Sequence, residues 1–284
     1  MKRSGVFTLI IGITTLLVII VGNYSFGKLG KGYEGSTAQG VESDALDVNE
    51  NSEDSSGLDD LKYPLLVMTF DDGADSDYDI IYPMLSDKGI KGTSYVVGDW
   101  LDSDGFMTSE QVLELSKSGW DIQDHTYQHL RLKEESLESV EGQVIENEKV
   151  FESIGLETPQ HMALPYGQVN DEGREVIAKH KKTIRNVGST SSGTVNYWDS
   201  IDFTNLNAVN IDTTDVDKIK EYIDYAIETK SIIILFGHRI GNDEYQTPLE
   251  TLDEITDYVV ELEIDTATIS EMYEQVTEYQ KLNH

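Results

Sequence analysis

From about residue 63 onward, short apolar runs alternate with longer amphipathic stretches along the chain. The runs predict strands at residues 65–70, 92–97, 120–124, 160–164, 183–187, 207–211, 231–237 and 265–269. Between them, apolar residues recur at intervals of three and four, which is the period of an amphipathic helix. This period predicts helices that include residues 77–89, 108–119, 136–155, 216–228 and 248–263. Several of these stretches end in glycine, which favours a helix end.

The alternation of strands and helices predicts the fold class. Strand and helix in strict alternation indicate an α/β protein with a parallel sheet, and seven to eight such units predict a (β/α) barrel. In a barrel of this kind, catalytic groups gather at the carboxyl ends of the strands. The residues that follow each predicted strand are therefore the first candidates for chemistry.

The N-terminal segment has a different pattern. Lys2 and Arg3 precede a nearly unbroken apolar stretch at residues 6–22, which is about long enough to cross a hydrocarbon core of roughly 30 Å. No small-residue cleavage motif follows it, so an uncleaved signal anchor within residues 1–22 is favoured over the alternative, a cleaved signal peptide. Either interpretation places the rest of the chain outside the cytoplasm, as a membrane-anchored or a secreted protein.

The next forty residues are rich in glycine, serine and acidic residues and lack apolar periodicity. Such a composition cannot bury enough apolar surface to offset its ordering entropy, so residues 23–62 are predicted to be a flexible linker. The folded domain is expected to span residues 63–284.

Charge and cysteine content exclude several kinds of partner and site. The chain has 53 acidic and 21 basic residues, and its net charge of −32 argues against a nucleic-acid partner, which would need clustered cations. The acidity is typical of a well-solvated surface, with a cationic polymer partner as the alternative. There are no cysteines, so any metal must be held by histidines and carboxylates.

Two adjacent carboxylates, Asp71 and Asp72, end the first predicted strand. A buried carboxylate is unfavourable unless it is paired or bound to a metal. After the third predicted strand comes HTYQH, in which His125 and His129 are four residues apart and would project from one face of a helical turn. Two imidazoles and one carboxylate with open positions form a recurring hydrolytic metal site.

Two further strand ends carry candidate groups. In ALPYG, Pro165 and Gly167 favour a turn that would aim the backbone N–H of Tyr166 into the site. The apolar run at residues 231–237 delivers His238, which beside a metal centre is a candidate general acid. The alternative for His238 is a hydrogen-bonded core residue.

The successive motifs TFDDG (69–73), HTYQH (125–129), PYG (165–167) and FGH (236–238) resemble those of the polysaccharide deacetylase family. This family is also called the NodB homology domain or carbohydrate esterase family 4. The resemblance covers roughly residues 63–275. It implies a distorted (β/α) barrel that binds a divalent metal, most often Zn²⁺ with Co²⁺, Ni²⁺ or Mn²⁺ as alternatives.

By the same resemblance, each motif residue receives an expected role. The metal ligands would be Asp72, His125 and His129. The catalytic base would be Asp71, and the catalytic acid would be His238. The backbone N–H of Tyr166 would donate to the oxyanion. Substrate-binding residues would be Pro165, Tyr166, Phe236 and Trp198. In this scheme one carboxylate of the Asp71–Asp72 pair holds the metal, and the other accepts the proton of the attacking water.

The chain departs from the family pattern at two motifs. Ala163 stands where the family usually carries an arginine that orients the base. The Asp-Trp of the fourth motif has no clear counterpart, since Trp198 and Asp199 occur in the reverse order. In the fifth motif, Phe236 replaces a leucine and would still line a pocket for the acetyl methyl group, with Trp198 as its partner.

The missing arginine directs attention to Arg185, which lies inside a predicted strand. The favoured interpretation is that its side chain extends out of the barrel or pairs with a surface acid. The other is that it reaches into the barrel and positions Asp71 from a neighbouring strand.

Three functions remain compatible with the residues and with what this resemblance implies. The favoured one is a metal-dependent deacetylase of an amino-sugar polysaccharide, of the chitin-like, peptidoglycan or poly-N-acetylglucosamine type. The alternatives are an O-acetyl glycan esterase or other amide deacylase, and a carbohydrate-binding pseudoenzyme. The sequence specifies neither the polymer nor the oligomeric state.

Overall fold

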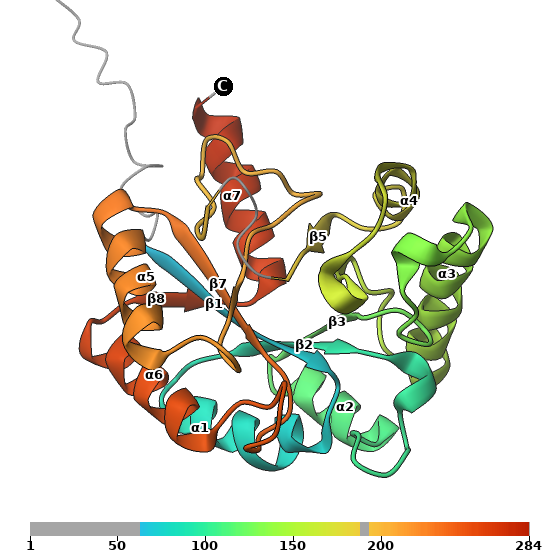
Figure 1. Cartoon of the computed structure of the whole chain (residues 1–284), viewed down its shortest axis with the longest axis horizontal. Coiled ribbons are helices and arrows are strands. Elements are labelled where there is room, and N and C mark those ends of the chain that lie inside the picture. Colours follow the sequence, from blue (N-terminus) through green and yellow to red (C-terminus); the bar gives the residue numbers. More distant parts are fainter. Residues whose placement is uncertain (1–62, 188–192, 284) are drawn as a thin grey trace, which may run out of the picture. The chain divides into compact units, whose positions relative to one another are not determined.

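A computed structural model describes residues 63–187 and 193–283 of the chain (Figure 1). The expected membrane segment at residues 6–22 and the expected linker at residues 23–62 lie outside the described residues. Among the helices that the structure does describe, none combines the length and the apolar character needed to cross a bilayer.

The described residues form one eight-stranded sheet, and all eight strands were predicted from the apolar runs. The strands are β1 Leu65–Asp72, β2 Gly92–Val96, β3 Asp121–Asp124, β4 His161–Ala163, β5 Thr183–Arg185, β6 Val209–Asn210, β7 Ile232–Gly237 and β8 Asp265–Ala267. Their order is β5-β4-β3-β2-β1-β7-β6, and β8 also pairs with β1. Every strand pairing is parallel, which confirms the predicted fold class.

The two ends of this sheet approach each other without forming a full strand ladder. Arg185 of β5 makes a single parallel bridge to Leu206, which lies just before β6. Backbone hydrogen bonds support it, from the Asn186 N–H to the Leu206 carbonyl (3.2 Å) and from the Ile184 N–H to the Phe203 carbonyl (2.8 Å). The sheet is therefore a distorted, incompletely closed barrel.

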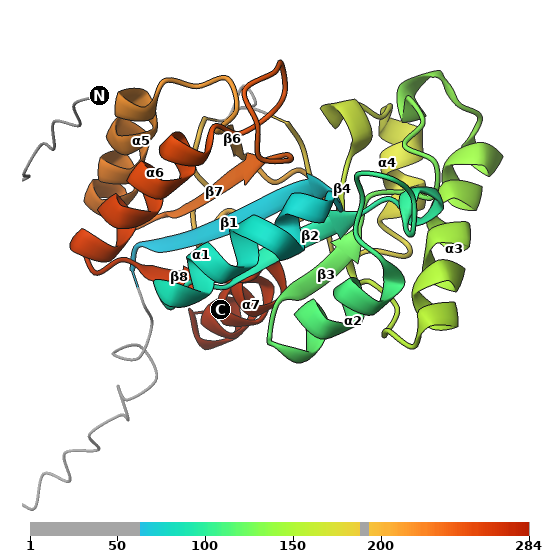
Figure 2. The same cartoon turned by 90° about the horizontal axis from the view of Figure 1, so that it is seen from below.

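Helices lie between most successive strands and cover the sheet, and α7 follows the last strand (Figures 1 and 2). They are α1 Tyr82–Asp87, α2 Ser109–Lys117, α3 Leu137–Ile154, α4 Asp171–Ile177, α5 Val216–Thr229, α6 Leu249–Glu261 and α7 Ile269–Asn283. The predicted helix at residues 77–89 begins as a π-helical turn, Asp77–Ile81. Helix α7 was not among the predicted helices, because it buries only a narrow stripe made of Ile269, Met272 and Val276.

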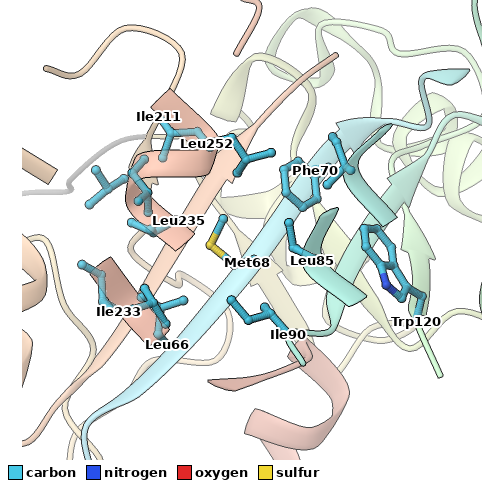
Figure 3. Packing of buried hydrophobic residues seen from close by; sticks show 14 of the residues in the cluster. Leu66, Met68, Phe70, Leu85, Ile90, Trp120, Ile211, Ile233, Leu235 and Leu252 are labelled. Carbon is cyan, nitrogen blue, oxygen red and sulfur yellow. The ribbon is translucent and has the colours of Figure 1, made fainter. Parts of the chain in front are cut away.

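Strand β1 is the centre of the core because it is buried on both faces. Leu66, Met68 and Phe70 belong to one buried cluster, and Leu65 and Val67 belong to a second cluster. Figure 3 shows the first cluster, in which side chains of β1 pack beside Leu85, Trp120 and Leu235 from neighbouring elements. Because β1 is packed on both faces, its position is fixed, and so are the positions of Asp71 and Asp72 at its carboxyl end.

Candidate metal and catalytic site

The polar residues that follow the strands meet in one pocket of about 440 Å³ at the carboxyl ends of β1, β3, β4, β6 and β7. Seven of the predicted site residues line it, namely Asp71, Asp72, His125, His129, Tyr166, Phe236 and His238. The structure therefore brings together residues that are as many as 167 positions apart in the sequence.

Three of these residues form a group that fits a divalent metal. One ligand atom each from Asp72, His125 and His129 lies within 4.8 Å of the others. Oδ1 of Asp72 is 3.4 Å from Nε2 of His125 and 3.5 Å from Nε2 of His129. Two ligand atoms that bind the same zinc ion in tetrahedral geometry at 2.0–2.1 Å lie about 3.3–3.4 Å from each other. The distances from Asp72 to the two imidazoles match this value.

Protonation states also fit a metal site. Nδ1 of His125 donates to the carbonyl of Ala163 at 2.9 Å, and since a carbonyl only accepts, Nε2 keeps a free lone pair. Burial and the neighbouring His125 lower the pKa of His129 to about 4. Burial alone would raise the pKa of Asp72, but the adjacent His125 lowers it to about 2. Its buried Oδ1 has no hydrogen-bond partner in the described residues, so a cation there would satisfy it.

The HTYQH segment is a loop, so the prediction that its histidines project from a helical turn was wrong. Thr126 and His129 adopt left-handed backbone conformations, with φ of 68° and 55°. Oδ1 of Asp124 accepts from the Thr126 N–H (2.7 Å), and Oγ1 of Thr126 accepts from the His129 N–H (2.9 Å). These side-chain bonds replace the helical ones and direct both imidazoles toward Asp72.

Asp71 is paired with Arg185, so the favoured prediction that Arg185 extends out of the barrel was wrong and the alternative, that it reaches into the barrel, is confirmed. Nη2 of Arg185 donates to both carboxylate oxygens of Asp71. The guanidinium is fully buried, and its carbon lies 5.2 Å and 4.5 Å from the ring centroids of Tyr95 and Phe236. Burial alone would raise the pKa of Asp71, but Arg185, followed by His125 and His238, holds it below its ordinary value.

The position of Arg185 explains the alanine in the third motif. Ala163 of β4 and Arg185 of β5 are direct partners in the parallel register. Ala163 is fully buried and has no side chain beyond Cβ. The arginine that the family resemblance expects at residue 163 is thus replaced by one from the adjacent strand.

His238 is oriented by Asp212, a residue that the sequence analysis missed. Nδ1 of His238 lies 2.6 Å from Oδ2 of Asp212, and the His238 N–H donates to Oδ1 of the same carboxylate at 3.2 Å. Burial lowers the pKa of His238, but the Asp212 hydrogen bond and the Asp71 charge outweigh it and raise the pKa to about 9. Asp212 directly follows the predicted strand at residues 207–211, and this position at a strand end is the signal that could have identified it.

Tyr166 lies on a sharply turned segment at the pocket wall. Its φ is 55°, and Gly167 follows with φ of 64°. A Cβ on Gly167 would lie 2.1 Å from Cγ2 of Val187, so the turn requires glycine here. The guanidinium carbon of Arg131 lies 4.0 Å from the Tyr166 ring centroid, which holds the ring at the rim.

Two predicted substrate-binding residues do not line the pocket. Pro165 is buried and begins the turn that carries Tyr166. Trp198 is buried against Tyr63 and Tyr279, with ring centroids 5.1 Å and 5.7 Å away, so its expected role beside Phe236 is not supported. Instead, the wall includes Arg131, Asn210 and Tyr245, which no motif marked.

Comparison with known proteins agrees with the motifs. Residues 59–184 match the family model described as polysaccharide deacetylase. A curated protein of Bacillus subtilis (strain 168) named "Putative polysaccharide deacetylase YxkH" is 28% identical over 114 residues, which are 40% of this chain. The match spans 41% of that relative's length.

Solved structures share the fold at low identity. The Xyl-CE4 domain of a multidomain xylanase from the hindgut metagenome of Trinervitermes trinervoides has a TM-score of 0.53 and 18% identity, covering 76% of this chain and 91% of that one. The Bc1960 peptidoglycan N-acetylglucosamine deacetylase has a TM-score of 0.53 and 18% identity, covering 74% and 87%. BA3943, a CE4 family pseudoenzyme from Bacillus anthracis, has a TM-score of 0.52 and 14% identity, covering 74% and 66%.

Proposed function

We propose that the chain, whose residues 59–184 match the polysaccharide deacetylase family model, is a member of that family and a metal-dependent hydrolase that removes N-acetyl groups from an amino-sugar polymer. The observation that carries the proposal is the pairing of Asp71 with Arg185 beside the Asp72, His125 and His129 group. A carboxylate held ionised next to a candidate metal site is suited to accept a proton from water.

Asp72, His125 and His129 would hold the ion. A divalent metal supplies Lewis-acid polarisation of the acetyl carbonyl and acidifies water, which makes attack feasible near neutral pH. The ion is expected to be Zn²⁺, since a site of two imidazoles and one carboxylate suits zinc.

The chain's own residues would move two protons. Asp71 takes a proton from the attacking water as its oxygen adds to the acetyl carbonyl carbon, while Arg185 keeps the carboxylate in place. His238, held protonated by Asp212, gives a proton to the sugar nitrogen as the carbon–nitrogen bond breaks. The products are acetate and the free amine. In this proposal the Tyr166 N–H donates to the developing oxyanion, and Phe236 lines the space for the acetyl methyl group.

The pseudoenzyme alternative requires the loss of a catalytic group. In this chain the third-motif arginine is missing from residue 163, but Arg185 supplies a guanidinium to the same carboxylate. His238 likewise has a carboxylate partner in Asp212. Both the base and the acid therefore keep the ionic partners that catalysis needs, which favours an active hydrolase.

Acetate release from a panel of acetylated polymers tests the proposal. We expect release from chitin oligomers, poly-N-acetylglucosamine or peptidoglycan with zinc added, and loss of at least about 10²-fold in Asp71→Asn, which cannot accept the proton. Asp104→Asn, an exposed carboxylate outside the pocket, is the matched control and should keep full activity. Release from O-acetylated xylan alone would identify an esterase, and no release from any polymer would refute the proposal.

We further propose that the catalytic domain acts outside the cytoplasm, tethered by residues 6–22. Support comes from the apolar length and the preceding cations of that segment. In intact cells, an external protease should degrade the domain, and N-terminal sequencing of the membrane fraction should begin at Met1. A start between residues 23 and 60 would show that the segment is removed.

A further inference from the structure

Lys181 is a buried lysine next to the start of the loop that carries His125 and His129. It follows α4 and precedes β5, and it is 4% exposed. A lysine is almost never buried to this degree unless its ammonium group is paired. The partners of Lys181 therefore indicate what its charge does in this fold.

Three oxygen atoms surround the Lys181 ammonium group. Its Nζ lies 2.9 Å from Oδ2 of Asp124 and donates to Oε1 of Glu148 and to the Pro159 carbonyl, both at 2.8 Å. The side chains of Lys181 and Asp124 are both 0% exposed, whereas that of Glu148 is 20% exposed. Salt and solvent screen a fully buried pair much less than an exposed one. The contact with Asp124 is therefore the one whose loss water can least compensate.

Asp124 depends on Lys181 at one of its two carboxylate oxygens. Its Oδ1 accepts from the Thr126 N–H and from Nδ2 of Asn147, both at 2.7 Å. Its Oδ2 is buried and receives no well-aligned hydrogen bond from the described residues, so the ammonium group of Lys181 is what compensates it. A buried charge without a partner is strongly unfavourable. Lys181 therefore helps to fix the orientation of the whole carboxylate.

Asp124 in turn holds the loop of the candidate metal ligands. It directly precedes His125, and its bond to the Thr126 N–H closes a tight turn around that histidine. Thr126 has φ of 68°, which a β-branched residue adopts only where its surroundings enforce it. Oγ1 of Thr126 then accepts from the His129 N–H. A chain of contacts thus runs from Lys181 through Asp124 and Thr126 to both histidines.

Lys181 also has a purely structural interaction, which is the alternative explanation for its burial. Its contact with Glu148 joins the segment after α4 to α3, and Figure 1 shows these two helices beside each other. The Glu148 contact does not pass through Asp124. Changing one carboxylate at a time therefore separates the two roles.

We propose that Lys181 is a positioning residue of the candidate metal site, which raises the affinity for the ion by fixing Asp124 and, through it, the loop of His125 and His129. The inference rests on the metal site of the proposed function, but not on the reaction assigned to that site. Residues that orient metal ligands from outside the ligand set typically change metal affinity by about 10- to 100-fold when they are removed.

Zinc titration of the full, metal-free chain tests this inference. Calorimetry gives the zinc affinity, and urea unfolding shows that each variant is folded. Lys181→Met keeps a long side chain and removes the charge, so it should weaken zinc binding by at least about tenfold. Glu148→Gln is the matched control, since it changes the other carboxylate partner, and its zinc affinity should stay within about twofold of the parent. Parental affinity in Lys181→Met, or equal losses in both variants, would overturn the proposal.

A double-mutant cycle keeps the proposal testable if Lys181→Met does not fold. Asp124→Asn retains an oxygen for the Thr126 N–H but needs no buried cation. It should weaken zinc binding by about threefold to tenfold, because a neutral oxygen accepts less strongly than a carboxylate. Adding Lys181→Met to Asp124→Asn should then change the affinity by less than about threefold, because the lysine acts through the missing charge. A further loss of tenfold or more would show that Lys181 does not act through Asp124.

Acetate release separates this inference from the proposed function. A parent chain that binds zinc and shows these differences in affinity, but releases no acetate, would refute the deacetylase proposal and leave the role of Lys181 standing. A chain that releases acetate, and whose Lys181→Met variant keeps the parental zinc affinity, would refute the role of Lys181 alone.

Discussion

The two ends of the sheet differ in backbone strain. At the carboxyl end, Asp72, Thr126, His129 and Tyr166 all have positive φ, between 55° and 79°. At the amino end, the non-glycine residues with positive φ are Lys230 (50°) and Glu263 (52°), which follow helices α5 and α6 where such a conformation commonly ends a helix, and no first residue of a described strand adopts it. Left-handed backbone in residues other than glycine is unfavourable and persists only where the surrounding structure enforces it. At the carboxyl end, the residues with positive φ are therefore those that form the candidate site or lie in its loops.

Buried carboxylates have different partners at the two ends of the sheet. At the carboxyl end, Asp71 is paired with a guanidinium and its pKa is lowered. At the amino end, Asp121 accepts hydrogen bonds from neutral groups, and burial raises its pKa. A carboxylate with a cationic partner stays ionised and can be offered to substrate, whereas one held by neutral donors mainly organises its neighbours.

The largest expected effect comes from the candidate metal ligands. His125→Ala should abolish metal retention and lower kcat/KM by at least about 10³-fold, because a three-residue site has little redundancy and a metal supplies several kcal/mol of transition-state stabilisation. Metal content by elemental analysis and acetate release are measured together. His161→Ala, a histidine at the amino end, is the control and should keep both. If His125→Ala still contains one metal ion per chain, His125 is not a metal ligand.

The second effect concerns Arg185. Arg185→Ala leaves Asp71 buried without its partner, so we expect a loss of about 3–5 kcal/mol of stability and about 10²-fold in kcat. Adding Ala163→Arg to this variant returns a guanidinium from the adjacent register position and should recover part of the rate. Urea unfolding and acetate release provide the two readouts.

Arg174 provides the control for the Arg185 variant. Arg174→Ala removes another partly buried arginine, one that donates to the Thr204 carbonyl at 2.6 Å, and should leave kcat unchanged. If Arg185→Ala lowers stability but not kcat, Arg185 has only a structural role.

The third prediction concerns pH and the metal-free chain. The pKa of His238 is about 9 in the fold and about 6.5 in an unfolded chain. Protonation of His238 therefore contributes stability that is fully present below pH 6.5 and is lost as the pH rises through 9. Asp212→Asn removes the main group that raises this pKa, so its stability should depend less on pH over this range.

Urea unfolding at pH 6, 8 and 10 in the presence of a chelator measures this effect. Glu141→Gln is the matched control, because Glu141 pairs with His180 at 3.2 Å in a more exposed position where solvent screens the charges. Identical pH profiles for the parent and Asp212→Asn would contradict the assigned coupling.

The smallest effect is expected at the amino end. The Ser270 N–H, in the first turn of α7, donates to Asp121, so Asp121→Ala should lower the free energy of unfolding by about 1–2 kcal/mol. The kcat for acetate release should stay within about twofold of the parent. Glu278→Ala, on the exposed side of α7, should change neither quantity. If Asp121→Ala lowers kcat while its stability is unchanged, the conclusion that the amino end has only a structural role is wrong.

Much of the fold was predictable because it depends on local pattern. Apolar runs located all eight strands, and the position of Asp71, Asp72, His125 and His238 after such runs predicted that they would meet. Helix α7 escaped prediction because its buried stripe is narrow, and the HTYQH loop was misassigned because side-chain bonds to Asp124 and Thr126 replace helical ones.

The sequence by itself determined which end of each strand would carry chemistry, since strand order along the chain and burial of β1 follow from apolar periodicity. Only the tertiary structure decided how the acid and the base are held. Arg185 reaches Asp71 across 114 positions, because β4 and β5 pair in a register that sets it beside Ala163. Asp212 reaches His238 because β6 and β7 are neighbours. Such pairings depend on strand register and order in space, which local periodicity does not encode.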